Sequence, residues 1–280
     1  MRDKVTAPGI RAAKGGPKIR MITAYDAPSA RIGDRAGADI LLVGDSVANV
    51  VLGRPTTLSM TLDEMIYHTR AVADTQPKAL VVGDMPWLTY HVSVEETVRN
   101  AGRMVRDGGA EAVKLEGGRK RLPMVEAVLD AEIPVMGHLG LTPQSVHAMG
   151  GYRVQGKDVK AARELVDDAR ALDAAGVFSI VLEGVPDVLA ALVTREVGAP
   201  TIGIGAGADV DGQVLVFHDL LGLGDGEHQP KFVRRYADLA DTAVDAVERF
   251  FEDVQKGEFP SGDETYHMPE KAAKELLGRE

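Results

Sequence analysis

The chain has 280 residues, of which 45% are hydrophobic, and its formal net charge is −10 at pH 7. This length and apolar content are enough to bury a large core in one or two domains. An acidic chain without a basic run is a poor candidate for binding nucleic acid, because that function needs Lys and Arg to neutralise phosphates. The lack of cysteine excludes disulfides, thiolate catalysis and cysteine metal sites.

The N-terminal segment, residues 1–18, reads as an extension ahead of the first strand. It carries basic residues but lacks the apolar core of a secretory signal. No run of about 18 apolar residues occurs anywhere in the chain, so the sequence predicts no membrane span. Together these observations predict a cytoplasmic protein.

Short apolar runs rich in β-branched residues recur along the chain. Most are nearly continuous, which is typical of parallel strands covered on both faces. Seven such runs are residues 20–26, 38–45, 79–84, 112–117, 133–140, 178–185 and 199–207.

Helical segments lie between these runs. Thr61 with Glu64, and Ser93 with Glu96, fit the capping box, in which side chains satisfy the first free N–H groups of a helix. Residues 160–175 and 188–197 are amphipathic and end near glycine. The alternation predicts one α/β domain over residues 1–280, a (β/α)8 TIM barrel, for which about 250 residues is typical.

The eighth strand has two candidate positions. Residues 212–223 look like a strand, but only eight residues separate Gly205 from Val214, too few for a crossover with its helix. We therefore assign residues 212–223 to a helix and the eighth strand to residues 232–236. A long helix with one apolar face follows, and residues 269–280 are predicted to be a loosely held tail.

An open, doubly wound sheet is the alternative fold, and it would favour a nucleotide ligand. The glycine-rich segment GIGAGADVDG at residues 203–212 fits that idea at first sight. However, it does not match G-x-G-x-x-G, and no helix start follows it. Tight packing at a strand end explains its glycines better than a phosphate site does.

Four of the first six strands end in acidic side chains. Asp45, Asp84 and Glu183 close three of these strands, and the fourth carries Lys114 and Glu116. Lys114 and Glu116 face the same way, because side chains two residues apart share one face of a strand. Catalytic groups of a barrel lie at the carboxyl ends of its strands, so these acids and the lysine are predicted to converge.

Clustered carboxylates in a partly dry site repel one another. Lys114 alone cannot balance four acids, so a divalent cation is the natural partner, and oxygen ligands favour Mg²⁺. Each residue also has a structural explanation when taken alone. An aspartate at a strand end is often a turn residue, Ser46 would cap the next turn, and His138 would be a buried structural histidine.

Several segments match one known family in unchanged order from about residue 19 to residue 260. They are ITAYD (22–26), LLVGDS (41–46), VKLEGG (113–118), GHLGLTPQS (137–145), GGYRVQGK (150–157), GIGAG with DGQVLVFHD (203–219) and PKF (230–232). In these segments the chain resembles ketopantoate hydroxymethyltransferase, also called 3-methyl-2-oxobutanoate hydroxymethyltransferase. The resemblance implies a (β/α)8 barrel of the phosphoenolpyruvate/pyruvate superfamily.

The resemblance also implies a reaction and its cofactor. The family transfers a hydroxymethyl group from 5,10-methylenetetrahydrofolate, or here a related pterin, to 3-methyl-2-oxobutanoate. The product is 2-dehydropantoate, in the synthesis of pantothenate and coenzyme A. The reaction depends on Mg²⁺, one ion per subunit, and family members form large homo-oligomers, commonly decamers.

The resemblance assigns roles to individual positions of this chain. Asp45 and Asp84 match the metal-binding aspartates of the family, and Glu116 matches the third acidic residue of the metal site. Glu183 matches the proton acceptor. The positions that match the oxoacid-binding residues are Asp45, Ser46, Asp84 and Lys114, with His138 lining the same site.

Two other functions stay open at this point. One is a C–C lyase of the same barrel superfamily that acts on a related oxoacid; many such lyases use a catalytic cysteine, which this chain lacks. The other is a non-catalytic barrel that binds an oxoacid. Such a barrel would bind the oxoacid without metal-dependent proton exchange.

Overall fold

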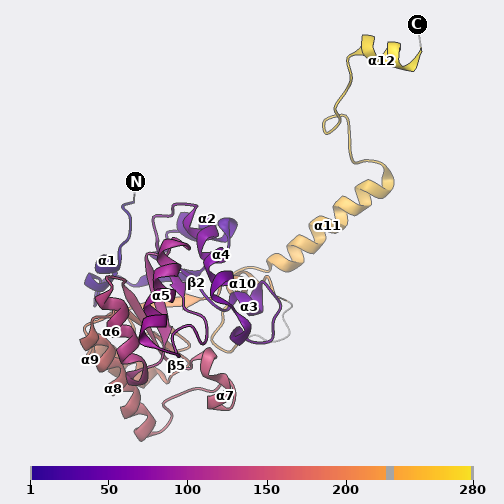
Figure 1. The fold of residues 1–280 in the computed structure, drawn as a ribbon. Helices are drawn as coiled ribbons and strands as arrows, with labels where there is room; N and C mark the ends of the chain where they lie inside the picture. The colour runs from indigo at the N-terminus through magenta and orange to yellow at the C-terminus, as the bar shows by residue number, and fades with distance from the viewer. Residues whose placement is uncertain (1, 225–229, 279–280) are drawn as a thin grey trace.

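The computed structural model describes residues 2–224 and 230–278. Eight parallel strands close into one barrel in sequential order, and β8 pairs with both β7 and β1. The strands are β1 (Ile19–Thr23), β2 (Ile40–Val43), β3 (Leu80–Asp84), β4 (Ala112–Glu116), β5 (Val135–Gly140), β6 (Ser179–Glu183), β7 (Thr201–Ile204) and β8 (Gly212–Leu215). The predicted (β/α)8 fold is confirmed (Figure 1).

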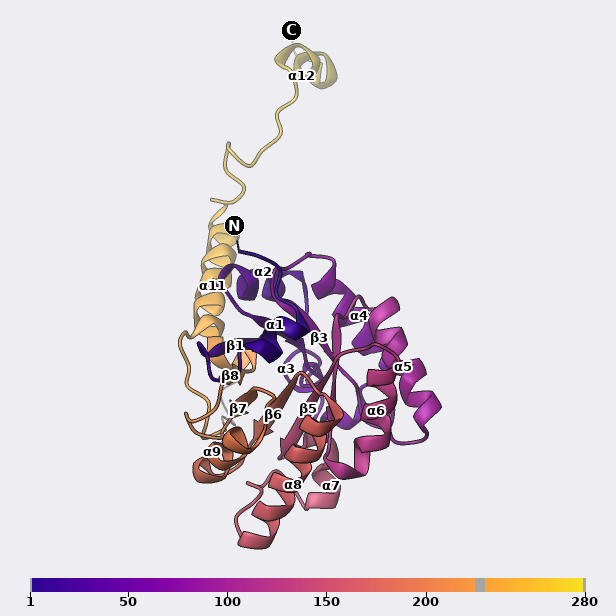
Figure 2. The same ribbon diagram turned by 90° about the vertical axis from the view of Figure 1, so that its left-hand side faces the viewer.

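Helices surround the strands, as Figure 2 shows from the side of α1. They are α1 (Ala7–Ala12), α2 (Ala27–Arg35), α3 (Val47–Val50), α4 (Leu62–Ala73), α5 (Val94–Arg106), α6 (Leu122–Asp130), α7 (Val146–Met149), α8 (Val159–Ala175), α9 (Asp187–Glu196), α10 (Phe217–Leu221), α11 (Leu239–Lys256) and α12 (Glu270–Leu277). Three 3₁₀ turns are η1 (Thr57–Ser59), η2 (Arg119–Arg121) and η3 (Pro143–Ser145).

The predicted helix starts can be checked one by one. The capping box at Thr61 and Glu64 is confirmed at the start of α4. At the start of α5, the Ser93 hydroxyl accepts a hydrogen bond from the backbone N–H of Glu96, which is one half of the predicted box. Helices α8 and α9 lie within one residue of their predicted bounds.

Two apolar layers explain why the strands read as continuous hydrophobic runs. Every residue of β2 and every residue of β3 is buried. One set of side chains, including Ile40 and Leu80, fills the barrel interior. The other, including Leu41 and Val81, packs between the strands and the surrounding helices. Burial on both faces is what a parallel barrel requires.

The predicted position of the eighth strand is wrong. Residues 232–236 form no strand, and β8 lies at Gly212–Leu215, inside the segment assigned to a helix. Only α10 within that segment is helical. The β7–β8 connection contains no helix, so the minimum length of a helical crossover did not apply to it. Gly205 and Gly207 have φ values of +64° and +79°, which let this short connection turn back.

The N-terminal extension closes the amino end of the barrel. Helix α1 buries Ala7 and Ile10 against the interior layer. Nζ of Lys14 donates to the backbone oxygen of Ala199 and to Oδ2 of Asp211, at 3.2 and 2.8 Å. The amino end of the barrel is therefore filled by residues of the chain itself.

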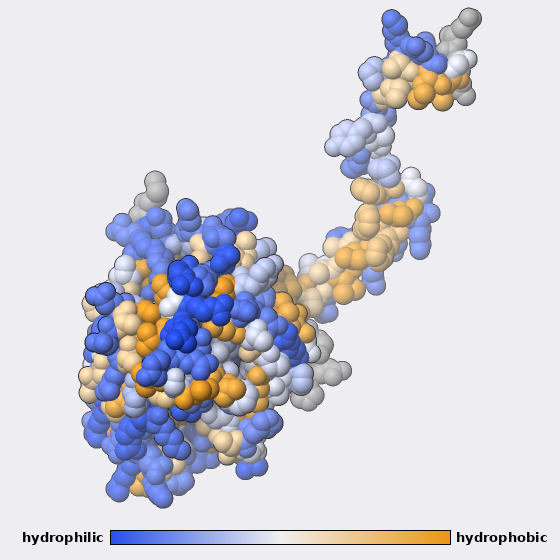
Figure 3. Space-filling view, in the orientation of Figure 1, coloured by the Kyte–Doolittle hydropathy of each residue, from blue (hydrophilic) through white to orange (hydrophobic). Residues whose placement is uncertain are grey.

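The C-terminal helices stand apart from the barrel. Helix α11, the predicted long helix, extends away from it, and α12 lies beyond in the segment predicted to be a tail (Figure 1). Apolar side chains cover part of the α11 surface (Figure 3), among them the exposed Val244, Val247 and Phe251. Among the described residues, no helix is long and apolar enough to cross a membrane.

Candidate active site

Neighbouring strands bring the predicted site residues to the carboxyl end of the barrel. Asp84 on β3 pairs in register with Lys114 on β4, and Glu116 on β4 pairs with His138 on β5. All four are buried, whereas the side chain of Glu183, at the end of β6, is 17% exposed. The register of the barrel strands therefore brings these side chains together, as predicted.

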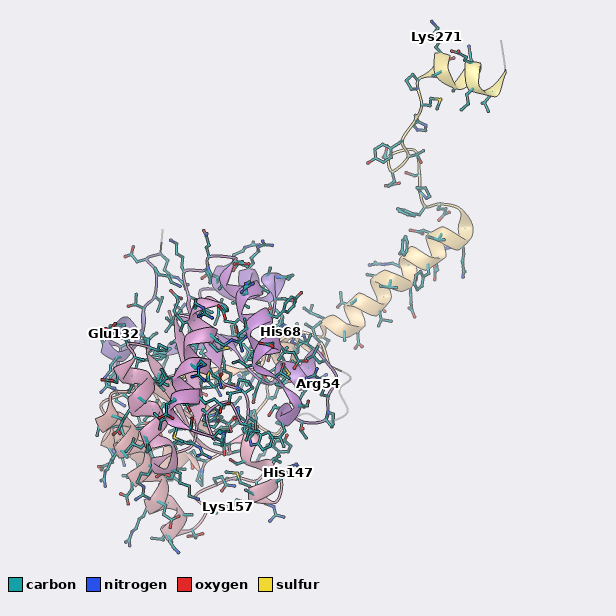
Figure 4. All side chains as sticks on the ribbon, viewed as in Figure 1. Arg54, His68, Glu132, His147, Lys157 and Lys271 are labelled. Atoms are coloured by element: carbon teal, nitrogen blue, oxygen red, sulfur yellow. The ribbon has the colours of Figure 1, made fainter. Side chains whose placement is uncertain are left out.

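Loops that follow β2 and β5 frame this end of the barrel. Figure 4 labels Arg54 in the first loop and His147 in the second, on the side of the barrel opposite α1. The two loops contact each other through η1 and η3. Arg54 forms an ion pair with Glu64 that anchors its loop to the start of α4.

Lys114 lies at the centre of the site. Its Nζ is 2.9 Å from Oδ2 of Asp84, and both side chains are almost fully buried. The same Asp84 oxygen accepts the backbone N–H of Asp45 at 3.3 Å. The lysine also lies 3.2 Å from Nδ1 of His138. One buried cation thus contacts an acid and a histidine at once.

His138 joins Lys114 to Glu183. Its Nδ1 faces the lysine, and its Nε2 lies 3.2 Å from Oε2 of Glu183. An ammonium group can only donate, so Nδ1 accepts and the ring proton lies on Nε2, facing the carboxylate. Burial, followed by the charge of Lys114, lowers the pKa of His138, which keeps the ring neutral. The histidine is therefore part of the site network.

The site contains more buried carboxyl groups than its one lysine can neutralise. Burial raises the pKa of Asp84 to about 7 and also raises the pKa values of Asp45 and Glu116. Burial alone would lower the pKa of Lys114, but the charges of Asp84, Glu116 and Asp45 raise it. One cation cannot stabilise three ionised carboxylates here, so a further positive charge would bind favourably.

The aspartates have donor atoms that suit a hard cation. Oδ1 of Asp84 is buried and has no hydrogen-bond partner among the described residues. Across residues 2–224 and 230–278, no group of three or more Asp, Glu or His side chains is arranged to hold a metal by itself. The buried, unpartnered Oδ1 of Asp84 would suit a cation such as Mg²⁺, which takes one or two carboxylates and completes its shell with substrate and water.

The structural alternative for Ser46, a cap on the next turn, does not hold. Ser46 occupies the N-cap position of α3, but its side chain makes no capping hydrogen bond there. Its hydroxyl lies 2.8 Å from the hydroxyl of Tyr25, whose pKa is raised by burial. The buried Tyr25 therefore fixes the orientation of the Ser46 hydroxyl.

Two site residues escaped the sequence analysis. Nε2 of Gln144, on η3, donates to Oδ2 of Asp45 at 2.9 Å, and Oε1 accepts from the hydroxyl of Tyr90 at 2.6 Å. Gln144 lies within the motif GHLGLTPQS, from which only His138 is predicted as a site residue. Tyr90 carries no sequence signal, because it follows β3 in an irregular loop.

A closed parallel barrel with acids, a lysine and a neutral histidine at the carboxyl ends of its strands is a (β/α)8-barrel enzyme. The family model described as ketopantoate hydroxymethyltransferase matches residues 4–262, and the chain belongs to this family. It is therefore a hydroxymethyltransferase, an enzyme that transfers a one-carbon unit.

Related enzymes match the sequence over nearly the whole chain. The 3-methyl-2-oxobutanoate hydroxymethyltransferase of Pelobacter propionicus is 56% identical over 95% of this chain and 99% of its own length. The enzyme of the same name from Koribacter versatilis is 54% identical over 97% of this chain and 92% of its own length. Family membership favours the transferase over the C–C lyase and the non-catalytic barrel.

Solved structures share the fold at low identity. Phosphoenolpyruvate phosphomutase from Streptomyces platensis subsp. rosaceus matches with a TM-score of 0.59 and 18% identity, covering 98% of this chain and 95% of its own. Phosphonopyruvate hydrolase, solved as a complex with oxalate and Mg²⁺, matches with a TM-score of 0.57 and 15% identity, over 98% and 95%. These likenesses support the (β/α)8-barrel fold.

Proposed function

We propose that this enzyme transfers a hydroxymethyl group from 5,10-methylenetetrahydrofolate, or a related pterin, to 3-methyl-2-oxobutanoate. The product is 2-dehydropantoate, and the reaction belongs to pantothenate and coenzyme A biosynthesis. The observation that carries this proposal is the line Lys114–His138–Glu183, with 3.2 Å at each contact. A neutral histidine links a partly exposed carboxylate to a buried cation, which suits removal of a proton next to a bound oxoacid.

The acidic half of the site would hold the cofactor. Asp45 and Asp84 would bind one Mg²⁺ per subunit, with Glu116 as the third acidic residue of the metal site. When bound, Mg²⁺ acts as a Lewis acid that polarises the keto group of the substrate. The partnerless buried oxygen of Asp84 supports this assignment. Oxalate with Mg²⁺, named for the phosphonopyruvate hydrolase structure, is a ligand pair of the same chemical kind.

The oxoacid would bind against the charged residues of the same cluster. Lys114 would offset the negative charge of its carboxylate and of the enolate that forms. Asp45, Ser46 and Asp84 would complete the oxoacid site. His138 would line it while keeping its Nε2 proton toward Glu183.

Glu183 would act as the general base. It takes the proton from C3 of the oxoacid, and the electron pair left on C3 then forms the new C–C bond to the methylene carbon of the donor. Water supplies the hydroxyl oxygen, and both C–N bonds of the methylene carbon break. The second proton of water and the proton taken by Glu183 restore the two N–H groups of the departing tetrahydropterin. General-base catalysis of this kind is typically worth roughly 10²–10⁴-fold in rate.

We also infer that the enzyme is a cytoplasmic homo-oligomer, a decamer as is common in its family, that binds neither nucleic acid nor membrane. The exposed Val247 and Phe251 of α11 support assembly, because apolar surface of this kind usually marks an interface. The net charge of −10 supports the lack of nucleic acid binding.

Product analysis tests the proposed reaction. The purified enzyme is incubated with 3-methyl-2-oxobutanoate, Mg²⁺ and 5,10-methylenetetrahydrofolate, and 2-dehydropantoate is measured by mass spectrometry. We expect product that depends on both substrates and disappears with EDTA. A second methylene-carrying tetrahydropterin, tested in parallel, identifies the preferred donor. Absence of product with every donor would contradict the proposal.

A further inference from the structure

Gln144 forms hydrogen bonds with two acidic side chains of the site, those of Asp45 and Glu116. Its side-chain Nε2 donates to Oδ2 of Asp45 and to the backbone oxygen of Met85, both at 2.9 Å. Its backbone N–H donates to Oε2 of Glu116 at 3.1 Å. Gln144 is 4% exposed, so water cannot readily replace these contacts.

Tyr90 fixes the orientation of the Gln144 amide. Its hydroxyl accepts the backbone N–H of Glu116 at 3.2 Å and donates to Oε1 of Gln144 at 2.6 Å. With Oε1 engaged as the acceptor, both hydrogens of the amide nitrogen point away from Tyr90, one to Asp45 and one to Met85. The opposite amide orientation would set two acceptors against each other at Asp45 and again at the backbone oxygen of Met85.

We propose that Gln144 and Tyr90 are positioning residues that hold the Asp45 carboxylate in the orientation required to bind the divalent cation. The hydrogen bond from Gln144 to one carboxylate oxygen restricts rotation of the Asp45 side chain before the cation binds. This inference rests on the proposed function, because it assigns a cation to Asp45. Hydrogen-bonding partners of this kind typically change metal affinity by about 10–100-fold when they are removed.

The test compares cation affinity in three variants. Gln144→Met keeps the length and volume of the side chain but removes the amide, and Tyr90→Phe removes only the hydroxyl. Tyr67→Phe is the matched control, because Tyr67 is 73% exposed on α4. Mn²⁺ serves as the probe for the Mg²⁺ site, and free Mn²⁺ is counted by electron paramagnetic resonance without oxoacid.

We expect the Mn²⁺ dissociation constant to rise about 10-fold or more in Gln144→Met. Tyr90→Phe should raise it in the same direction by less, and Tyr67→Phe should leave it unchanged. The double variant Gln144→Met with Tyr90→Phe should bind no more weakly than Gln144→Met, because both changes act through one amide. Saturating Mg²⁺ should restore most of the turnover, which a merely structural defect would not allow.

The outcomes separate the two proposals. If the wild-type enzyme binds no Mn²⁺, the cation site of the proposed function fails. If the wild type binds Mn²⁺ and both variants bind it within about twofold as tightly, the positioning role is overturned while the proposed function stands. Should Gln144→Met fail to fold by circular dichroism, Tyr90→Phe, which keeps the packed ring, decides the question alone.

Discussion

Nε2 of His138 lies 3.2 Å from Oε2 of Glu183, and the other nitrogen of the same ring lies 3.2 Å from Nζ of Lys114. A neutral ring with its proton on Nε2 turns an acceptor toward the lysine and a donor toward the carboxylate. The proposed base is therefore oriented by a donor that does not itself carry charge. The carboxylate stays available to accept a proton.

Replacing His138 should slow the chemical step more than it weakens binding. In His138→Ala, Glu183 loses the polar neighbour whose Nε2 lies 3.2 Å from its Oε2. We expect kcat to fall about 10- to 100-fold, with a smaller change in KM for the oxoacid. Steady-state kinetics measures both. His267→Ala, at an exposed position of the C-terminal segment, is the control.

Lys114→Met should destabilise the metal-free enzyme. The substitution leaves Asp84 buried without its cation, and breaking a buried ion pair typically costs about 3–5 kcal/mol. Urea denaturation in EDTA and in saturating Mg²⁺ measures the effect, which should be smaller with Mg²⁺. Lys256→Met breaks only the exposed pair with Glu252 and should cost less than about 1 kcal/mol. Equal losses in the two variants would contradict the buried ion pair.

Ionisation of Asp84 should lower the stability of the metal-free enzyme as the pH rises from about 4 to about 7. This carboxyl ionises near 3.8 when unfolded, but burial raises its pKa to about 7 in the folded state. In that window the folded state binds more protons, so raising the pH removes stability. Asp84→Asn abolishes this contribution. Stability–pH curves of the two proteins that run parallel from pH 4 to 8 would refute the prediction.

Charges on the apolar face of α11 should break the proposed homo-oligomer. Val247 and Phe251 are 47% and 56% exposed. In the variant Val247→Glu with Phe251→Glu, burying two carboxylates in an apolar interface would be unfavourable. Sedimentation velocity should then show a smaller species than the wild type. The control is Glu252→Gln on the same helix. An unchanged sedimentation coefficient in the charged variant would exclude α11 from the interface.

Much of the site could be predicted, because in a parallel barrel every strand delivers its carboxyl end to the same face. Asp84, Lys114 and Glu183 were placed from strand ends alone, and neighbouring strands set their register. The position of the eighth strand could not be predicted from this pattern. A loop that returns without a helix breaks the alternation on which the prediction depended.

The contacts around Gln144 could not be predicted from strand patterns. Gln144 lies in η3 and Tyr90 in a loop, where periodicity carries no information about side-chain direction. Tyr90 meets Gln144, and Gln144 meets Asp45, because of how the loops after β3 and β5 fold over the barrel. Only the assembled structure brings those loops together.

Proton exchange at C3 of the oxoacid tests the central claim, that Glu183 forms the enolate in a cation-dependent site. The enzyme is incubated with 3-methyl-2-oxobutanoate and Mg²⁺ in D₂O, and the C3 proton signal is followed by NMR. The pterin is added only if no exchange occurs without it. We predict loss of the signal with the wild type and its persistence with EDTA or with Glu183→Gln. Exchange that continues at the wild-type rate in Glu183→Gln would contradict the account.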